Sequence, residues 1–391
     1  MTQSRTHTCG ELRLANAGET VTLVGWMENI REVGNNFAFL VLRDFYGTTQ
    51  VVIENEEMMN IVKPLNKEST ISVTGIVRER TSKNPKLPTG DIEIAPTEIT
   101  VLGRCRYNEL PFEINHSREA DESQRLKYRY LDLRNPEVKA NIILRCNVVS
   151  ALRTAMTEHG FLEITTPILT ASSPEGARDY LVPARKHPGK FYALPQAPQQ
   201  FKQLLMTAGF DRYFQIATCF RDEDARGDRS PGEFYQMDME MAFASQEDVF
   251  AVIEDVLPPI FAKYGTYNIA SSAPFARIPY RQAMEEFGSD KPDLRIDLTV
   301  QDVTDLLGAC GFGPFEGNVV KAVVVSDFHE TRKFIDKTLA DVEVVSGGKP
   351  YWFRLDENGE IVGGIAKFVQ PIKESVVSAL GLKPNDFVAL S

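Results

Sequence analysis

The 391-residue sequence is poor in the residues that build disulfide or metal frameworks. Its five cysteines and five histidines are scattered, and it contains no CxxC and no HExxH motif. This spacing argues against a zinc ribbon, a disulfide framework and a histidine-ligated metal, so we assign no metal ligand in this chain. No apolar run approaches the ~18 residues of a membrane span, and the polar N-terminus lacks an apolar signal region. The sequence therefore predicts a cytoplasmic protein without a membrane partner.

Basic residues are also in deficit, with 43 Lys and Arg against 54 Asp and Glu and a net charge of −11. This balance argues against wholesale coating of nucleic acid, but it allows a local basic footprint. Two segments are locally basic. Each is either a footprint for nucleic acid or a solvated surface, which is the usual role of a charge run, so both interpretations stay open. The segments carry Arg78, Arg80, Lys83 and Lys86, and Arg125, Lys127, Arg129 and Arg134.

Short β-branched and aromatic segments fill the first hundred residues, and turn residues separate several of them. One helical stretch, 56–65, falls between the third and fourth segments. Five strands with a helix in that position are typical of an OB-fold, a small barrel that often binds single-stranded nucleic acid. An SH3-like or other small barrel is the alternative. The predicted strands are 20–26, 37–43, 48–53, 70–78 and 91–101.

A long helix follows the polar, irregular stretch 108–134. Asn135 can cap this helix, Pro136 occupies its first position, and Gly160 lies just past its end. Apolar residues recur at helical spacing, which predicts one buried stripe. The stripe consists of Val138, Ile142, Val149, Leu152 and Met156.

Two strands at 213–221 and 233–243 flank a charged loop. Side chains alternate between the faces of a strand, so an antiparallel pair presents Gln215, Arg221, Gln236 and Asp238 on one surface. That surface suits a small charged ligand, or it is simply a solvated sheet face. The opposite face is a predicted core that includes Phe214, Tyr235, Met237, Met239 and Met241.

Two further segments carry charge near these strands. A helix from 198 to just before Gly209 places Gln199 and Lys202 on one side, with Phe201, Leu204 and Leu205 toward the core. Lys202 is either a point charge for a carboxylate or an ordinary surface lysine. In the loop 173–179, Glu175 either receives an ammonium group or forms a loop salt bridge.

Taken in order, these segments resemble class II aminoacyl-tRNA synthetases, most closely the aspartyl enzymes of bacterial type, over essentially the whole chain. Each piece is short, but the ordered set is specific. The pieces are the hinge signature RLKYRYLDLR at 125–134, motif 1 GFLEITTP at 160–167, the flipping loop SPEGARD at 173–179, the aspartate-binding stretch APQQFK at 197–202, and motif 2 FRDED at 220–224 with EFYQMD at 233–238.

The resemblance implies a multidomain α+β fold. Residues 1–105 would form an OB-fold β-barrel that binds the anticodon, and 106–134 a hinge. Residues 135–272 would form part of the class II catalytic domain, with its antiparallel sheet, and 273–391 the start of an inserted α+β domain. The chain ends inside what resembles that insertion, so motif 3 and the acidic Mg²⁺ ligands would follow residue 391. We therefore expect this polypeptide alone to be catalytically incompetent.

The resemblance also assigns roles to residues. Arg221 and Glu223 would be catalytic, and Pro167 would belong to a homodimer interface. Aspartate would contact Glu175, Gln199, Lys202, Arg221, Gln236 and Asp238. ATP would contact Arg221, Asp222, Glu223 and Phe234. The anticodon would contact Arg31, Phe39, Gln50, Arg78 and Glu93.

The implied activity is aspartate–tRNA ligation, with L-aspartate, ATP, Mg²⁺ and tRNA-Asp, and with tRNA-Asn as a further substrate left open. An aspartate carboxylate would attack the ATP α-phosphorus, so positioning and charge stabilisation would supply the catalysis. A protein that binds tRNA without activating aspartate is the competing hypothesis. A sister enzyme for asparagine or lysine is a third, which the loop at 173–179 and the Gln199–Lys202 pair disfavour.

Overall fold

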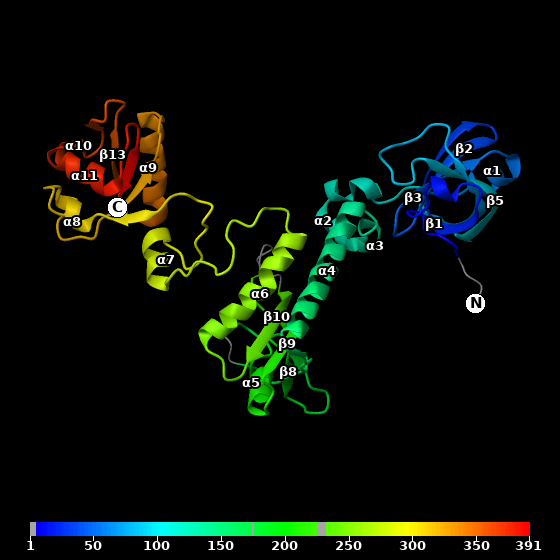
Figure 1. Ribbon diagram of the computed structural model, residues 1–391, viewed down its shortest axis with the longest axis horizontal. Coiled ribbons are helices and arrows are strands. Elements are labelled where there is room, and N and C mark those ends of the chain that lie inside the picture. The colour runs from blue at the N-terminus through cyan, green and yellow to red at the C-terminus, as the bar shows by residue number, and fades with distance from the viewer. Residues whose placement is uncertain (1–4, 174–175, 225–231) are drawn as a thin grey trace. The chain divides into compact units, whose positions relative to one another are not determined.

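The computed structural model describes residues 5–173, 176–224 and 232–391. The chain divides into two compact units, Met1–Ile269 and Ala270–Ser391, which are coloured blue to yellow and yellow to red in Figure 1. Across the described residues, every helix is too short or too polar to cross a lipid bilayer.

A closed five-stranded barrel forms the first part of unit Met1–Ile269, with strand order β1-β2-β3-β5-β4. Alternate side chains such as Leu40, Val51 and Ile94 fill its interior, because successive residues of a strand point to opposite sides. The topology confirms the predicted OB-fold. Its elements are β1 (Thr20–Gly34), β2 (Phe37–Arg43), β3 (Thr48–Ile53), α1 (Glu56–Val62), β4 (Thr70–Glu79) and β5 (Ile92–Gly103).

Two of the predicted barrel elements have different lengths in the structure. Strand β1 continues to Gly34, beyond the predicted end at 26, because its second half pairs with β2, as in Arg31 opposite Phe39. Helix α1 ends at Val62 rather than at 65, since Pro64 cannot continue a helix. Asn55 caps α1 by accepting a hydrogen bond from the Met58 amide.

The stretch 108–134 is more regular than its polar sequence indicates. It forms three short helices, η2 (Ile114–Glu119), α2 (Glu122–Lys127) and α3 (Arg129–Asp132). Phe112, Ile114 and Leu131 form a small apolar core between them. Asp132 is fully buried beside this core. The stretch is therefore a folded module, and the predicted irregular linker is wrong.

Helix α4 (Pro136–Glu158) begins where Asn135 predicts it, because the Asn135 side chain accepts from the Glu137 amide. The predicted buried stripe is wrong in its middle, where Ile142 is 43% exposed. Helix α6 (Gln246–Tyr264) packs Val252 and Val256 against the C-terminal half of α4. In α4, side chains are therefore buried in the C-terminal half, as at Met156, and in the first turn, at Val138.

The remaining part of unit Met1–Ile269 is built on a three-stranded sheet of order β10-β9-β6. Strands β9 and β10 pair antiparallel, and β6 runs parallel to β9. Ser245 and Asp248 form the capping box that starts α6. The elements are β6 (Leu162–Glu163), β7 (Leu181–Pro183), β8 (Phe191–Ala193), α5 (Gln199–Thr207), β9 (Arg212–Phe220) and β10 (Glu233–Met241).

Unit Ala270–Ser391 is a separate α+β module around a five-stranded sheet of order β11-β12-β15-β13-β14. A two-glycine turn passes tightly beneath Trp352, since a Cβ added at Gly364 would lie 1.8 Å from the Trp352 carbonyl oxygen. Its elements are α7 (Tyr280–Phe287), β11 (Val300–Asp302), α8 (Thr304–Leu307), η3 (Gly313–Phe315), β12 (Lys321–Val325), α9 (Arg332–Ser346), β13 (Tyr351–Leu355), β14 (Ile361–Val362), α10 (Ala366–Val369), η4 (Gln370–Ile372), α11 (Lys373–Leu380) and β15 (Phe387–Leu390).

Candidate functional site

One face of the β9–β10 pair is polar, as strand alternation predicts. Asp238 lies opposite Gln215, and Phe234 lies opposite Cys219. The other face sends Met237, Met239 and Met241 into the core beside Phe214. Tyr235 is an exception to the predicted core face, because it is 50% exposed and Arg145 lies 4.3 Å from its ring centroid.

Lys202 is the cation at the centre of this polar face. Its Nζ lies 2.9 Å from Asp238 Oδ1 and 3.2 Å from Glu240 Oε2, and its side chain is only 12% exposed. Lys202 is therefore not an ordinary surface lysine. Burial alone would lower its pKa, but the hydrogen bonds and charges of Asp238 and Glu240 outweigh burial and raise it. The site holds a fixed positive charge at neutral pH.

Asp238 is only half satisfied. Its Oδ1 accepts from Lys202, whereas its buried Oδ2 makes no hydrogen bond within the described residues, although the buried Tyr213 hydroxyl lies near the carboxylate. A buried carboxylate oxygen without a donor costs free energy unless a ligand or water supplies one. Lys202 and Asp238 together thus offer a cation and an open acceptor side by side, which is a pattern suited to an amino acid.

Arg221 follows the last residue of β9 and faces Phe234 at the start of β10. Its guanidinium carbon lies 5.0 Å from the Phe234 ring centroid, and its amide donates to the Gly232 carbonyl at 2.8 Å. Asp222 and Glu223 are exposed beyond it. A guanidinium beside an aromatic ring is suited to a phosphate next to a flat base.

The loop that was expected to receive an ammonium group is anchored by a residue that the sequence analysis missed. Gln196 is buried, and its side-chain amide donates to the Ala177 carbonyl at 2.8 Å and to Asp179 Oδ1 at 2.6 Å. The Asp222 amide donates to the Arg178 carbonyl at 2.9 Å, and Arg178 Nε donates to the Asp222 carbonyl at 2.8 Å, which joins the same loop to motif 2. Glu175 lies outside the described residues. An isolated buried glutamine before a helix carries no local signal of this role.

Two other predictions for this region need correction. Gln215 points to the polar face, but its side chain bonds Thr166 through Nε2 to Oγ1 at 2.8 Å, so it ties motif 1 to the sheet. Leu204 on α5 is 63% exposed rather than facing the core. Gln199 and Gln236 are half-buried beside the Lys202 site, and Pro167 is exposed next to Ile168 and Leu169.

The five residues expected at the anticodon all point away from the interior of the barrel. Arg31 pairs with Phe39 across β1 and β2, and its guanidinium lies 5.1 Å from the Phe39 ring centroid. Glu93 accepts from Gln50 at 2.9 Å and from Arg78 at 2.8 Å. Glu54, which the sequence analysis missed, binds both terminal nitrogens of Arg78.

The two basic segments are neither free footprints nor merely solvated surfaces. In the second segment, Arg125 and Arg129 bind the buried Asp132, and Arg134 binds the buried Glu68. In the first, Arg78 is already held by acids. Most of these cations therefore have structural partners, which a run of charge in sequence does not reveal.

No group of three or more His, Cys, Asp or Glu side chains within the described ranges is arranged to hold a metal ion. The residues that the structure describes do not form a magnesium site by themselves. We therefore assign no step to Mg²⁺ in this chain.

Comparisons with known proteins agree with this geometry. A family model described as tRNA synthetases class II (D, K and N) matches residues 121–373, and one described as an OB-fold nucleic acid binding domain matches residues 21–102. An aspartate–tRNA ligase of Streptomyces avermitilis is 52% identical over 94% of this chain and 63% of the relative. An aspartate–tRNA(Asp/Asn) ligase of Zymomonas mobilis is 50% identical over 98% of this chain and 65% of the relative.

These shares mean that the chain spans just under two thirds of the length of such relatives. Among solved structures, an asparaginyl-tRNA synthetase of Pyrococcus horikoshii complexed with asparaginyl-adenylate superposes with a TM-score of 0.61 at 18% identity. The match covers 100% of this chain and 93% of that one, and it supports the fold. By sequence and by fold, the chain belongs to the class II tRNA synthetases of the D, K and N group, with an OB-fold nucleic acid binding domain at its N-terminus.

Proposed function

We propose that the protein acts as an aspartate–tRNA ligase, which activates L-aspartate with ATP and transfers it to the 3′ end of tRNA-Asp. The observation that carries this proposal is the partly buried cluster of Lys202, Asp238 and Glu240. A free aspartate has two carboxylates and one ammonium group. The cluster offers a fixed cation for a carboxylate and an open oxygen of Asp238 for the ammonium group.

Specificity for aspartate follows from the cost of burying unpaired polar groups. Asparagine, whose side chain is uncharged, would offer Lys202 no side-chain carboxylate to replace its contacts with Asp238 and Glu240. Sites that bind a charged or hydrogen-bonding group reject analogues that lack it strongly, because the buried partner then stays unsatisfied. Gln199 and Gln236 would complete the walls of this pocket.

In the first reaction step, an oxygen of the aspartate α-carboxylate bonds to the α-phosphorus of ATP, and pyrophosphate leaves with the electrons of the broken P–O bond. Arg221 would neutralise charge on the α-phosphate and the carboxylate, Phe234 would stack on adenine, and Glu223 would contact ATP beside Asp222. In the second step, a ribose hydroxyl at the tRNA 3′ end takes the aspartyl group and AMP leaves. Positioning and charge stabilisation would supply the catalysis in both steps.

The outer face of the barrel is proposed to bind the anticodon. Phe39 would stack on one splayed base, which is the usual way that proteins read single-stranded RNA. Arg31, Gln50, Arg78 and Glu93 would then supply hydrogen bonds around that base. The relatives named for tRNA(Asp/Asn) make tRNA-Asn a second RNA to test against tRNA-Asp.

We also propose that the enzyme is a cytoplasmic homodimer. Several apolar side chains near motif 1 are more than one third exposed, which is unusual for a monomer surface when they are contiguous. They lie on the middle of α4 and around Pro167. They are Ile142, Ile143, Leu144, Leu162, Ile168 and Leu169.

The decisive test is aspartate-dependent ATP–pyrophosphate exchange with the 391-residue chain. Exchange above background would show that residues 1–391 assemble an adenylation site. Binding of tRNA without exchange would favour the competing hypothesis, a polypeptide that recognises tRNA without activating aspartate. In any form that shows exchange, Arg221→Ala should reduce it by at least about a hundredfold. Arg281→Ala, in an exposed ion pair with Glu285, is the matched control.

A further inference from the structure

A single buried carboxylate, that of Glu68, lies at the base of the barrel in an unusual backbone conformation. Glu68 precedes β4, has a φ of +65° and is 8% exposed. Its amide donates to the Met27 carbonyl at 2.8 Å, which fixes this conformation. A non-glycine residue in the left-handed region costs on the order of 1 kcal/mol and persists only where its surroundings require it.

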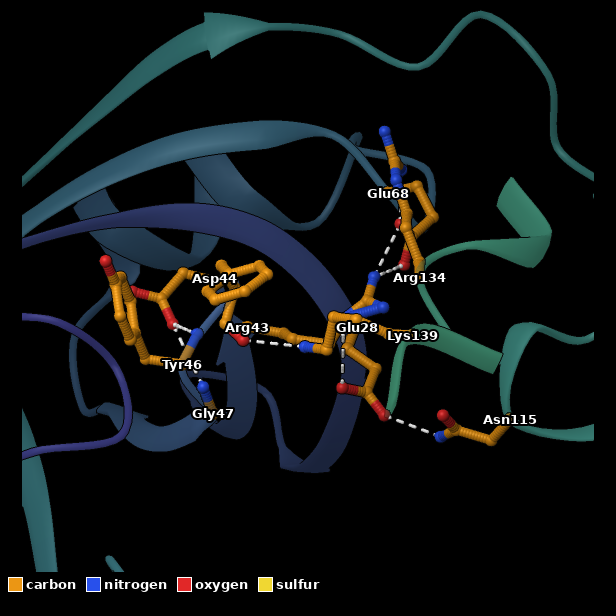
Figure 2. A network of polar contacts seen from close by, with 10 residues as sticks. Glu28, Arg43, Asp44, Tyr46, Gly47, Glu68, Asn115, Arg134 and Lys139 are labelled. Atoms are coloured by element: carbon orange, nitrogen blue, oxygen red, sulfur yellow. Dashed lines mark hydrogen bonds and ion pairs between the residues drawn. The ribbon is translucent and has the colours of Figure 1, made fainter. Parts of the chain in front are cut away.

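The Glu68 carboxylate joins two arginines that come from different parts of the unit. Arg43, at the end of β2, donates to both of its oxygens at 2.5 and 2.6 Å. Arg134, between α3 and α4, donates to Oε2 at 2.5 Å and lies 4.3 Å from the ring centroid of Trp26 in β1. Figure 2 shows Arg134 reaching Glu68 from the opposite side to Arg43. The barrel and the helical module are thus connected through one desolvated charge cluster.

Two neighbouring contacts strengthen this connection (Figure 2). Glu28 accepts from Asn115 of η2 at 2.8 Å through Oε1, and its Oε2 lies 3.5 Å from Arg43 Nε. Lys139 of α4 donates to the Phe45 carbonyl at 2.6 Å. Burial and the nearby Arg43 charge lower the pKa of Lys139, as expected for a partly buried ammonium group near another cation.

The turn that receives Lys139 is itself preorganised. Asp44 accepts from the amides of Tyr46 and Gly47 at 2.8 and 3.1 Å, and from the Cys9 amide at 2.9 Å. The contact therefore joins helix α4 to a rigid turn between β2 and β3. Two of the three connections, those of Lys139 and Arg134, reach α4 or the residues that lead directly into it, and the third, that of Asn115, reaches η2.

We propose that Glu68 is a positioning residue that fixes the barrel relative to the hinge and to α4, so that one tRNA contacts both parts at a set separation. The inference rests on the proposed function, since it concerns how the same tRNA is bound at two places. When two sites are held at the spacing of their ligand, the second contact is intramolecular and the overall affinity rises without any new contact. Loosening Glu68 lowers that gain while each site keeps its own affinity.

The test compares two RNAs, a full tRNA-Asp transcript and a short hairpin that carries only its anticodon stem and loop, by fluorescence anisotropy. Glu68→Gln keeps the shape of the side chain and removes its charge. We expect the affinity for full tRNA to fall about tenfold or more, while hairpin affinity stays within about twofold. A purely structural defect of the barrel would lower the affinity for both RNAs by the same factor.

The matched control is Glu113→Gln. Glu113 pairs with Lys67 across the same boundary, but both side chains are exposed, at 66% and 45%, so little change is expected with either RNA. If Glu68→Gln fails to fold, Arg134→Met breaks the same ion pair and leaves Glu68, with its left-handed backbone, unchanged. Circular dichroism identifies an unfolded variant.

Three results would overturn the proposal. The first is unchanged affinity for full tRNA in both Glu68→Gln and Arg134→Met. The others are a loss of hairpin affinity equal to the loss for full tRNA, or a loss in Glu113→Gln equal to that in Glu68→Gln. A wild-type chain that binds neither RNA would instead contradict the proposed function. The two failures are therefore distinguishable.

Discussion

Two aspartates with little-exposed side chains, Asp132 in the hinge and Asp238 on the sheet face, differ in how fully their oxygens are bonded. Asp132 accepts from Ser117 at 2.7 Å, from Arg125 and from Arg129, so both oxygens are bonded. Asp238 has Lys202 on one oxygen and no partner on the other among the described residues. Complete bonding indicates a structural role, whereas an open buried oxygen indicates a ligand. Mutations at the two positions should therefore separate stability from binding.

The largest effect is expected at Asp132. Asp132→Asn keeps the size of the side chain but leaves Arg125 and Arg129 beside a neutral amide, and breaking such a buried pair costs about 3 kcal/mol of unfolding free energy. Urea unfolding followed by circular dichroism measures this loss. Glu119→Gln, at an exposed residue of the same module, should change it by less than about 0.5 kcal/mol. If Asp132→Asn and Glu119→Gln have equal free energies of unfolding, Asp132 has no structural role.

Acid should reproduce this loss in the wild-type protein. Burial alone would raise the pKa of Asp132, but hydrogen bonds from Ser117, Arg125 and Arg129 and the Arg125 charge outweigh burial and lower it. Because the folded pKa lies below the unfolded value of about 3.9, the contribution is complete above about pH 3.9 and is lost as pH falls through the folded pKa. The stability difference between wild type and Asp132→Asn should therefore shrink as pH falls below about 4.

Asp238 should show the opposite balance. Asp238→Asn removes the open carboxylate oxygen, so affinity for aspartate should fall by about 2–3 kcal/mol. Stability should change less, because Lys202 keeps Glu240 at 3.2 Å. Isothermal titration calorimetry with aspartate measures the first quantity, and urea unfolding the second. A large loss of stability with unchanged aspartate affinity would show that Asp238, like Asp132, is structural.

The sequence predicted the parts of the molecule that depend on local pattern. Strands β2 and β3 agree with the predicted ranges residue for residue, because alternation of apolar residues fixes both the strand and its buried face. The same alternation placed Asp238 on the polar face with Phe234. The Asn135 cap likewise agrees with its prediction from the short spacing of Asn135 and Pro136.

The parts that could not be predicted depend on partners far apart in the chain. Glu68 and Arg134 are separated by 66 positions, and neither carries a local signal for the other. Gln196 is similar, since it binds a loop 17 to 19 positions earlier. The stripe on α4 failed for the same reason, because helical spacing shows which side is apolar but not whether another element covers it. Ile142 is therefore exposed despite its pattern.

The smallest expected effect concerns Phe39 on the outside of the barrel. Like the carboxylate of Asp238, its ring has contacts within the chain and is also proposed to contact a ligand. Phe39 is half-buried, with Arg31 over its ring and the centroid of the perpendicular Phe37 ring 5.2 Å from its own. Phe39→Ala should weaken binding of the anticodon hairpin by about 1–3 kcal/mol, the usual contribution of one stacked base.

Two further substitutions at Phe39 separate stacking from simple bulk. Phe39→Trp keeps a flat aromatic ring and should retain hairpin affinity, whereas Phe39→Leu keeps an apolar side chain without a ring and should behave like Phe39→Ala. Fluorescence anisotropy with the hairpin ranks the three variants. If Phe39→Leu binds as tightly as wild type, the ring serves packing on the barrel surface. The open side of Phe39 would then not be a site for RNA, and the parallel with Asp238 would fail.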